Sequence, residues 1–66
     1  MRVICTAVLE NEPQRNNLRQ CIGIIGGKPD VSGETVCVEY EGSSNVAQKF
    51  IELFEQYVTH EIKILS

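Results

Sequence analysis

Hydrophobic and polar residues alternate with different periods along the chain, and each period predicts a type of element. Residues 2–9 are apolar or β-branched on both alternating sets, which is the pattern of a strand in the middle of a sheet. Residues 35–40 instead place apolar side chains on one face and more polar ones on the other. Residues 60–65 alternate polar and apolar positions, and their charges favour an edge strand.

One segment has a strong helical period. Between residues 44 and 59 apolar side chains recur every three or four positions, and polar side chains fill the opposite face. Ser43 and Ser44 precede this stripe and offer an N-cap. We therefore expect a helix over 44–59. Its apolar stripe consists of Val46, Ala47, Phe50, Ile51, Leu53, Phe54, Tyr57 and Val58.

The segment after the first strand is ambiguous. Asn11 is a suitable helix N-cap, Pro13 suits a first turn, and Gln14 occupies the capping-box position. Two consecutive asparagines and a thin apolar stripe argue against a helix here. We favour a short helix of two or three turns within 11–20 over a long hairpin loop.

Two further segments complete the order of elements. Residues 21–25 (CIGII) predict a short strand, and residues 26–34, rich in glycine, predict a loop. The order β, α, β, β, α, β fits an α+β two-layer sandwich, the ferredoxin-like βαββαβ fold, with a four-stranded sheet whose first and third strands are central. The alternative is a β-meander followed by helix and strand, βββαβ, which requires residues 11–17 to be a loop.

Length and composition limit the organisation of the chain. The 66 residues suffice for a single domain, residues 1–66, with a small core, because a domain of this size buries only about 60% of its unfolded surface. The hydrophobic content of 42% is too high for a disordered chain. The apolar run at 3–9 is too short for a membrane span and lacks a cleavage site, so we expect no targeting segment, no membrane partner and a cytoplasmic location.

The charge of the chain argues against nucleic acid as a partner. Nine acidic residues outnumber six basic ones, whereas binding to phosphate backbones requires an excess of lysine and arginine. The charge is also uneven along the sequence. Residues 1–33 hold four basic and three acidic residues, and residues 34–66 hold two basic and six acidic ones.

Few residues offer catalytic or metal-binding chemistry. The three cysteines lie outside CxxC spacing, and we expect them to be small apolar residues on or beside strands. His60 is the only histidine and is expected to end the long helix, and Glu39 and Glu41 alone provide too few oxygens for a hard metal ion. We assign no catalytic residue, no metal and no cofactor, and we lean against an enzyme.

The only basic cluster that the sequence predicts involves the ambiguous segment and the loop. Arg15 and Arg19 lie four residues apart and project together if the segment is helical, and Lys28 and Asp30 lie in the loop 26–34. Paired guanidinium groups can bind a carboxylate or a phosphate. Residues 23–28 resemble a phosphate-binding loop only superficially, because Pro29 follows the lysine where a nucleotide site needs serine or threonine.

The function that we expect is a non-enzymatic binding or regulatory one. A core this small gains stability from association, so we expect a protein partner, with a homodimer as the first choice. The edge strand at 61–65 and the second strand would be the surfaces. One alternative is a binder of an anionic small molecule, or a minimal enzyme, that uses the loop 26–34 with Arg15, Arg19 and Lys28. Another is a viral or mobile-element inhibitor of a host factor.

Overall fold

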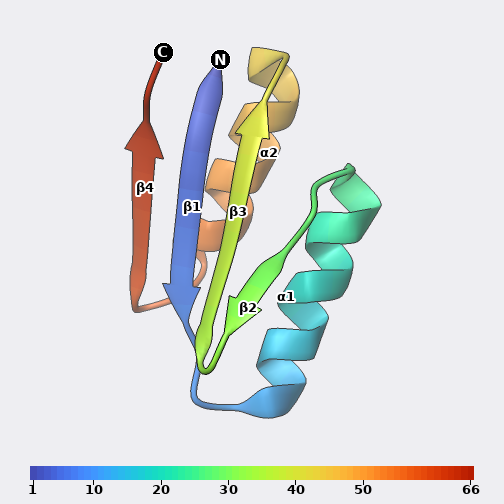
Figure 1. Cartoon of the computed structure of the whole chain (residues 1–66), viewed down its shortest axis with the longest axis vertical. Helices are drawn as coiled ribbons and strands as arrows, with labels where there is room; N and C mark the ends of the chain where they lie inside the picture. The colour runs from blue at the N-terminus through green and yellow to red at the C-terminus, as the bar shows by residue number, and fades with distance from the viewer.

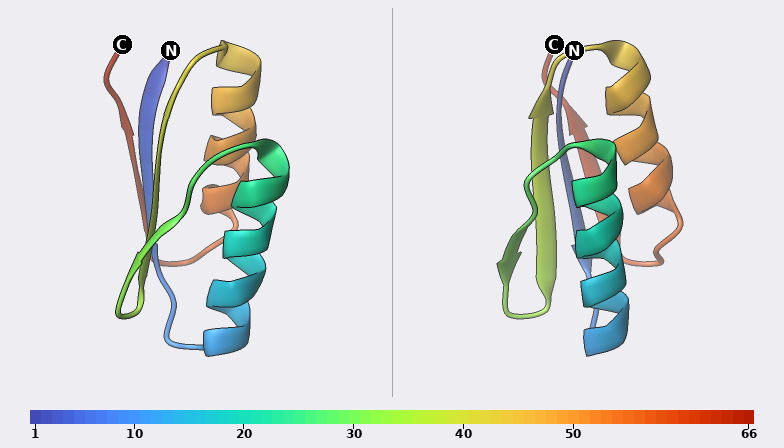
Figure 2. Two further views of the ribbon diagram at one scale, coloured as in Figure 1. Left: turned by 45° about the vertical axis from the view of Figure 1, so that its right-hand side comes forward. Right: turned by 90° about the vertical axis from the view of Figure 1, so that its right-hand side faces the viewer.

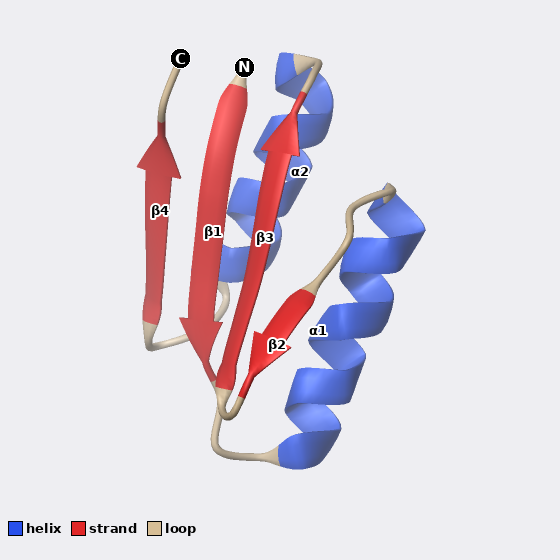
Figure 3. Ribbon diagram, viewed as in Figure 1, coloured by secondary structure: helices blue, strands red, loops and turns tan.

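A computed structural model describes all residues, 1–66, and has the element order βαββαβ (Figure 1). The elements are β1 (Arg2–Val8), α1 (Glu12–Ile25), β2 (Asp30–Ser32), β3 (Thr35–Glu41), α2 (Ser44–Glu55) and β4 (His60–Ile64). The four strands form one antiparallel sheet in the order β2-β3-β1-β4, with both helices on one face (Figures 2 and 3). This confirms the predicted ferredoxin-like sandwich, and the βββαβ alternative is wrong because a helix directly follows β1.

The central place of β1 follows from its apolar sequence. In the register of the sheet, Cys5 lies between Val38 of β3 and Ile62 of β4. Val3, Cys5 and Ala7 point toward the helices and are fully buried. The other alternating set of β1 side chains lies on the face that no helix covers. A strand that is apolar on both alternations is thus placed where it has a neighbour on each side, as its sequence predicts.

The core lies between the sheet and the two helices and is entirely apolar. The rings of Tyr40 on β3 and Phe50 on α2 lie 5.3 Å apart between centroids, at 43°, which is a favourable tilted arrangement. No polar or charged residue is buried. The buried residues are Val3, Cys5, Ala7, Leu9, Leu18, Ile22, Val36, Val38, Ala47, Phe50, Ile51 and Phe54.

Helix α1 begins where the sequence predicts and extends further. The Asn11 side chain accepts a hydrogen bond from the Gln14 backbone N–H at 3.1 Å, which confirms the predicted N-cap. The helix then continues through 21–25, so the strand predicted there is wrong. Ile22 continues the apolar face that Leu18 begins, and both side chains are fully buried in the core. Gly26 ends the helix in the left-handed conformation, with φ of 111°.

The second strand lies within the segment predicted as a loop. β2 pairs with the beginning of β3 through a two-residue turn, in which Gly33 has φ of 60°. All residues of β2 are exposed, so no apolar alternation marks this strand in the sequence. Its pairing with β3 is a consequence of the turn rather than of burial.

Helix α2 is shorter than its apolar stripe predicts. The Ser43 side chain caps it by accepting from the Val46 N–H at 3.3 Å, and the helix ends at Glu55 rather than residue 59. Val58, predicted to lie on the stripe, is fully exposed in the connection to β4. Neither α1 nor α2 has the length and apolar content needed to cross a membrane.

Candidate functional site

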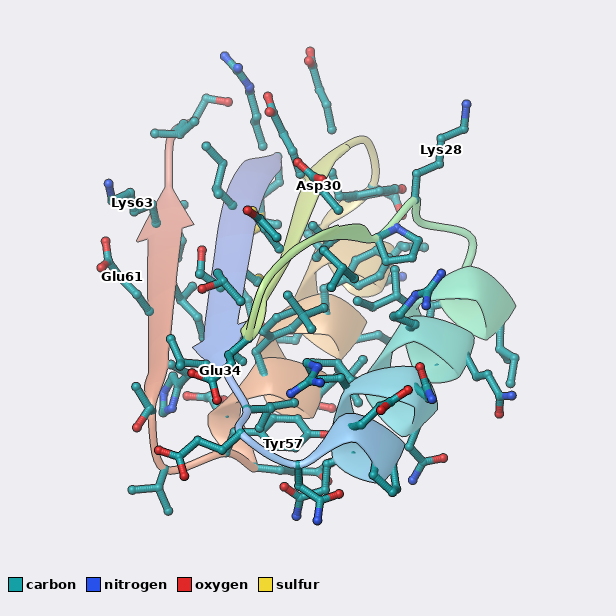
Figure 4. The ribbon with its side chains drawn as sticks, turned by 60° about the horizontal axis from the view of Figure 1, so that its bottom comes forward. Lys28, Asp30, Glu34, Tyr57, Glu61 and Lys63 are labelled. Atoms are coloured by element: carbon teal, nitrogen blue, oxygen red, sulfur yellow. The ribbon has the colours of Figure 1, made fainter.

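The uncovered face of the sheet carries two ion pairs. On β1 and β3, the Arg2 guanidinium donates to one carboxylate oxygen of Glu39 from Nη2 at 2.6 Å and from Nε at 3.1 Å. This hydrogen bonding and the negative charge of Glu39 raise the pKa of Arg2. On β4, Lys63 Nζ lies 3.4 Å from a Glu61 oxygen. Figure 4 shows Glu61 and Lys63 projecting from the same side of β4.

Of the predicted basic cluster, Arg15 has a structural contact of its own. Its guanidinium donates from Nη1 to the Leu9 carbonyl at 2.7 Å, and the side chain is half-buried. The Leu9 N–H in turn donates to the Glu34 carbonyl at 2.8 Å, so this connection joins β1, α1 and the β2–β3 turn. The Arg15 guanidinium thus uses one of its N–H donors for a hydrogen bond to the protein's own backbone.

We expect Arg15→Ala to lower the free energy of unfolding by about 1 kcal/mol, because a charge-assisted hydrogen bond to the backbone is lost. Arg19→Ala removes the same side chain one turn further along α1 and should change stability by less than about 0.5 kcal/mol. Urea unfolding followed by circular dichroism measures both. Equal effects of the two substitutions would contradict a structural role for Arg15.

The structure brings Arg19 beside the segment that holds Lys28 and Asp30, whereas Arg15 lies apart from it. Arg19 lines a shallow polar hollow together with Pro29. Lys28 extends from the connection after α1 into solvent, and Asp30 begins β2 (Figure 4). Arg15 lies near the start of α1 and Lys28 beyond its end, so about ten residues of helix, roughly 15 Å, separate their backbones. The helix therefore keeps Lys28 well apart from Arg15. Anion binding by these residues stays a prediction.

A second hollow lies between the two helices. It has a volume of about 350 Å³ and is lined by Cys21, Ile24 and Ile25 of α1 and by Leu53 of α2, among others. Ile24 is 85% exposed, which is unusual for an isoleucine. The sequence interpretation missed this groove because it placed residues 21–25 in a strand.

The three cysteines are free and differ in their surroundings. Cys5 is buried in the core, whereas Cys21 and Cys37 are partly exposed. Burial raises the pKa of the Cys5 thiol from 9.0 to about 11, and the nearby Cys37 adds a smaller contribution in the same direction. On the uncovered face, the Thr6 hydroxyl donates to Cys37 Sγ at 3.8 Å. Cys5 is therefore a neutral core residue at neutral pH.

We expect stability to fall as the pH rises from about 9 toward 11, because the unfolded chain releases the Cys5 proton more readily than the folded one. The contribution is complete below pH 9 and is lost as the pH approaches the folded pKa. Cys5→Ala should flatten this part of the stability profile, whatever its effect at neutral pH. Val36→Ala, which also truncates a fully buried side chain but removes no titratable group, is the control and should retain the slope. An unchanged slope in Cys5→Ala would contradict the assignment.

The free edge of the sheet at β4 offers backbone groups to a partner. The Thr59 carbonyl accepts from the Val8 N–H at 3.1 Å, and the Leu65 N–H donates to the Arg2 carbonyl at 2.9 Å. In an antiparallel ladder, every second residue of a strand bonds the same neighbouring strand through its N–H and C=O groups. Because Thr59 and Leu65 bond β1, the backbone groups of the odd-numbered β4 residues face β1. The N–H and C=O groups of His60, Ile62 and Ile64 consequently point away from the sheet.

Exposed apolar side chains gather beside this edge. Ile64 is 60% and Leu65 47% exposed, and Val58 is fully exposed just before the strand. Val8, also exposed, hydrogen-bonds the chain at Thr59 where β4 begins. Of the large exposed apolar residues, only Ile24 and Val31 lie elsewhere. At the opposite edge, β2 has only three residues and pairs with only the first part of β3, so β4 is the longest strand with one side wholly free.

Comparison with known proteins adds no further guide to the site. No family model matches the chain, and neither a curated protein nor a solved structure matches it.

Proposed function

We propose that this protein is a non-enzymatic binding module that acts by association with another protein chain, and that its first partner is a second copy of itself. The observation that carries the proposal is the free edge of β4, where outward backbone groups and exposed apolar side chains occur together. A sheet edge of this kind binds by adding a strand, in which main-chain hydrogen bonds provide affinity and side chains provide specificity.

The small core supports the same proposal. Apart from Leu9, the buried residues come from one face of the sheet and one stripe of each helix, so the stability of a single chain is limited. A partner that binds only the folded state adds stability that grows with the logarithm of partner concentration. A small domain with a free edge therefore gains both stability and a means of recognition from association.

We place this activity in the cytoplasm. The three free cysteines support that location, because reducing compartments keep thiols unpaired. One of them, Cys5, is a core residue, so oxidation to a disulfide would require the core to open.

The experiment that tests the proposal is light scattering coupled to size exclusion, over a dilution series from about micromolar to millimolar protein. We expect the mass to rise with concentration from 7.4 kDa toward twice that value. A constant mass of 7.4 kDa up to the highest concentration would contradict self-association. A reducing agent is kept present throughout, so that intermolecular disulfides at Cys21 or Cys37 do not contribute.

A further inference from the structure

We infer that two copies of this chain pair through β4 in one antiparallel register, centred on Ile62, which is selected by reciprocal ion pairs between Glu61 of one chain and Lys63 of the other. The inference rests on the proposed function and specifies its surface and its partner. The pairing would join the two sheets into one continuous sheet, with β4 of each chain at its centre.

The direction of the backbone groups restricts the registers that two β4 strands can adopt. His60, Ile62 and Ile64 direct their N–H and C=O groups outward, as derived above from the bonds between β1 and β4. In an antiparallel pair, outward residues must oppose outward residues to exchange both hydrogen bonds. A register centred on Ile62 satisfies this for the whole strand: Ile62 opposes the partner's Ile62, and His60 opposes the partner's Ile64.

Charge then separates this register from its neighbours. A shift that centres the pair on Glu61 places two carboxylates directly opposite each other, and one centred on Lys63 does the same with two ammonium groups. Like charges directly opposite across strands are destabilising. Registers centred further along β4 leave fewer of its residues paired. With Ile62 at the centre, each Glu61 opposes the partner's Lys63, and both pairs are favourable.

The geometry of these pairs favours close contact. Glu61 and Lys63 occupy positions that do not exchange hydrogen bonds with the partner, where opposing side chains come closest. Both lie on the uncovered face of the sheet, opposite Thr6 and Ile4 of β1, so no helix stands in the way. Lys63 already lies 3.4 Å from Glu61 of its own chain, and the pairing surrounds each charge with two of the opposite sign.

The apolar side chains at the edge fit the same arrangement. On the helix-facing side, the two Ile62 side chains become neighbours, and Ile64 gains the partner's His60 as its opposite residue. On the uncovered side, Leu65 comes opposite the partner's Thr59, which lies between Leu65 and the partner's exposed Val8. Exposed apolar residues at the ends of β4 are thereby brought against a surface, which removes them from water.

The test is a charge-reversal series at the two positions. Glu61→Lys and Lys63→Glu each convert both cross-chain pairs from opposite to like charges, and each should raise the Kd of the dimer by about tenfold or more. The double variant E61K/K63E restores opposite charges in the same register and should dimerise about as tightly as the natural sequence. Sedimentation equilibrium measures all four proteins, and circular dichroism establishes that each is folded.

Mixing the two single variants gives a sharper result. One variant carries only positive and the other only negative charges at these positions, so the heterodimer in an equimolar mixture should have a lower Kd than the homodimer of either variant. Lys49→Glu on α2 and Glu52→Lys change the net charge by the same amounts away from β4, and they should leave the Kd unchanged. Raised salt should strengthen the homodimers of the single variants at 61 and 63 and weaken that of the natural sequence.

Two failures have different meanings. If the natural chain dimerises and the reversals at 61 and 63 behave like those at 49 and 52, the register is wrong while the proposed function stands. The same conclusion follows if the two single variants dimerise weakly and do not pair more tightly when mixed. If the natural chain is monomeric at all concentrations, both the register and self-association are overturned.

Discussion

Phe50→Ala is expected to lower the free energy of unfolding by about 3–5 kcal/mol, which is most of the stability of a domain of this size. Phe50 is fully buried where α2 crosses the sheet, and its ring packs against Tyr40 with centroids 5.3 Å apart. Its removal leaves a cavity that the short helix and the small core have few side chains to fill. Urea unfolding at a fixed protein concentration measures the change.

Ile24→Ala is the matched control for the loss of Phe50. It also removes apolar atoms from a helix, but Ile24 is 85% exposed, so we expect a change of less than about 0.5 kcal/mol. Protein concentration is held constant because self-association adds stability to every variant. A Phe50→Ala protein as stable as the natural one would contradict the packing of α2 on the sheet.

Gly27→Val is expected to lower the free energy of unfolding by about 3 kcal/mol, because it adds atoms to a filled part of the core. A Cβ at Gly27 would lie 2.7 Å from Phe50 Cζ and 3.0 Å from Ile22 Cγ2. Both neighbours are fully buried, so neither can move aside without disturbing the core. Overpacking of this kind typically costs 1–3 kcal/mol, and a branched side chain lies at the upper end of that range. Gly27→Ala should have a smaller effect in the same direction.

Gly23→Ala gives the contrasting result within the same segment. Gly23 lies inside α1, and a Cβ there would meet nothing within 4 Å. Alanine is the better helix former, so we expect this substitution to stabilise the protein by about 1 kcal/mol. Opposite signs at Gly23 and Gly27 would confirm that contact with Phe50, rather than the loss of glycine itself, determines the effect. Destabilisation at both positions would contradict this explanation.

The sequence predicts the architecture well where a period is long and clear. β1 is apolar on both alternations and β3 alternates, and the structure places them as the two central strands. The segment 21–25 defeats the same reasoning, because a run of five residues that are almost all apolar is compatible with a buried strand or a buried helix face. In the structure the segment is helical, and Leu18 and Ile22, one turn apart, are both buried in the core.

The candidate site shows a similar division. The charged alternation of residues 60–65 predicts an edge strand, and β4 lies at the edge. Which β4 residues direct their N–H and C=O groups away from the sheet depends on how β1 and β4 align, and the sequence does not reveal this alignment. The contact between Arg15 and the Leu9 carbonyl likewise depends on the path of the connection after β1. A spacing of four residues from Arg19 predicts a shared helix face but not this backbone partner.

The position of β1 between β3 and β4 has a consequence for how the protein folds as it is made. Cys5 pairs with Val38 and with Ile62, so β1, which precedes both of its partner strands in the sequence, finds its neighbours only later in synthesis. Bringing such distant segments together requires the closure of long loops, which slows folding. Until β4 has emerged, β1 can pair on one side at most, and the N–H and C=O groups along its other side stay open to other chains. The nascent chain therefore stays prone to aggregation along this side of β1 until β4 has emerged.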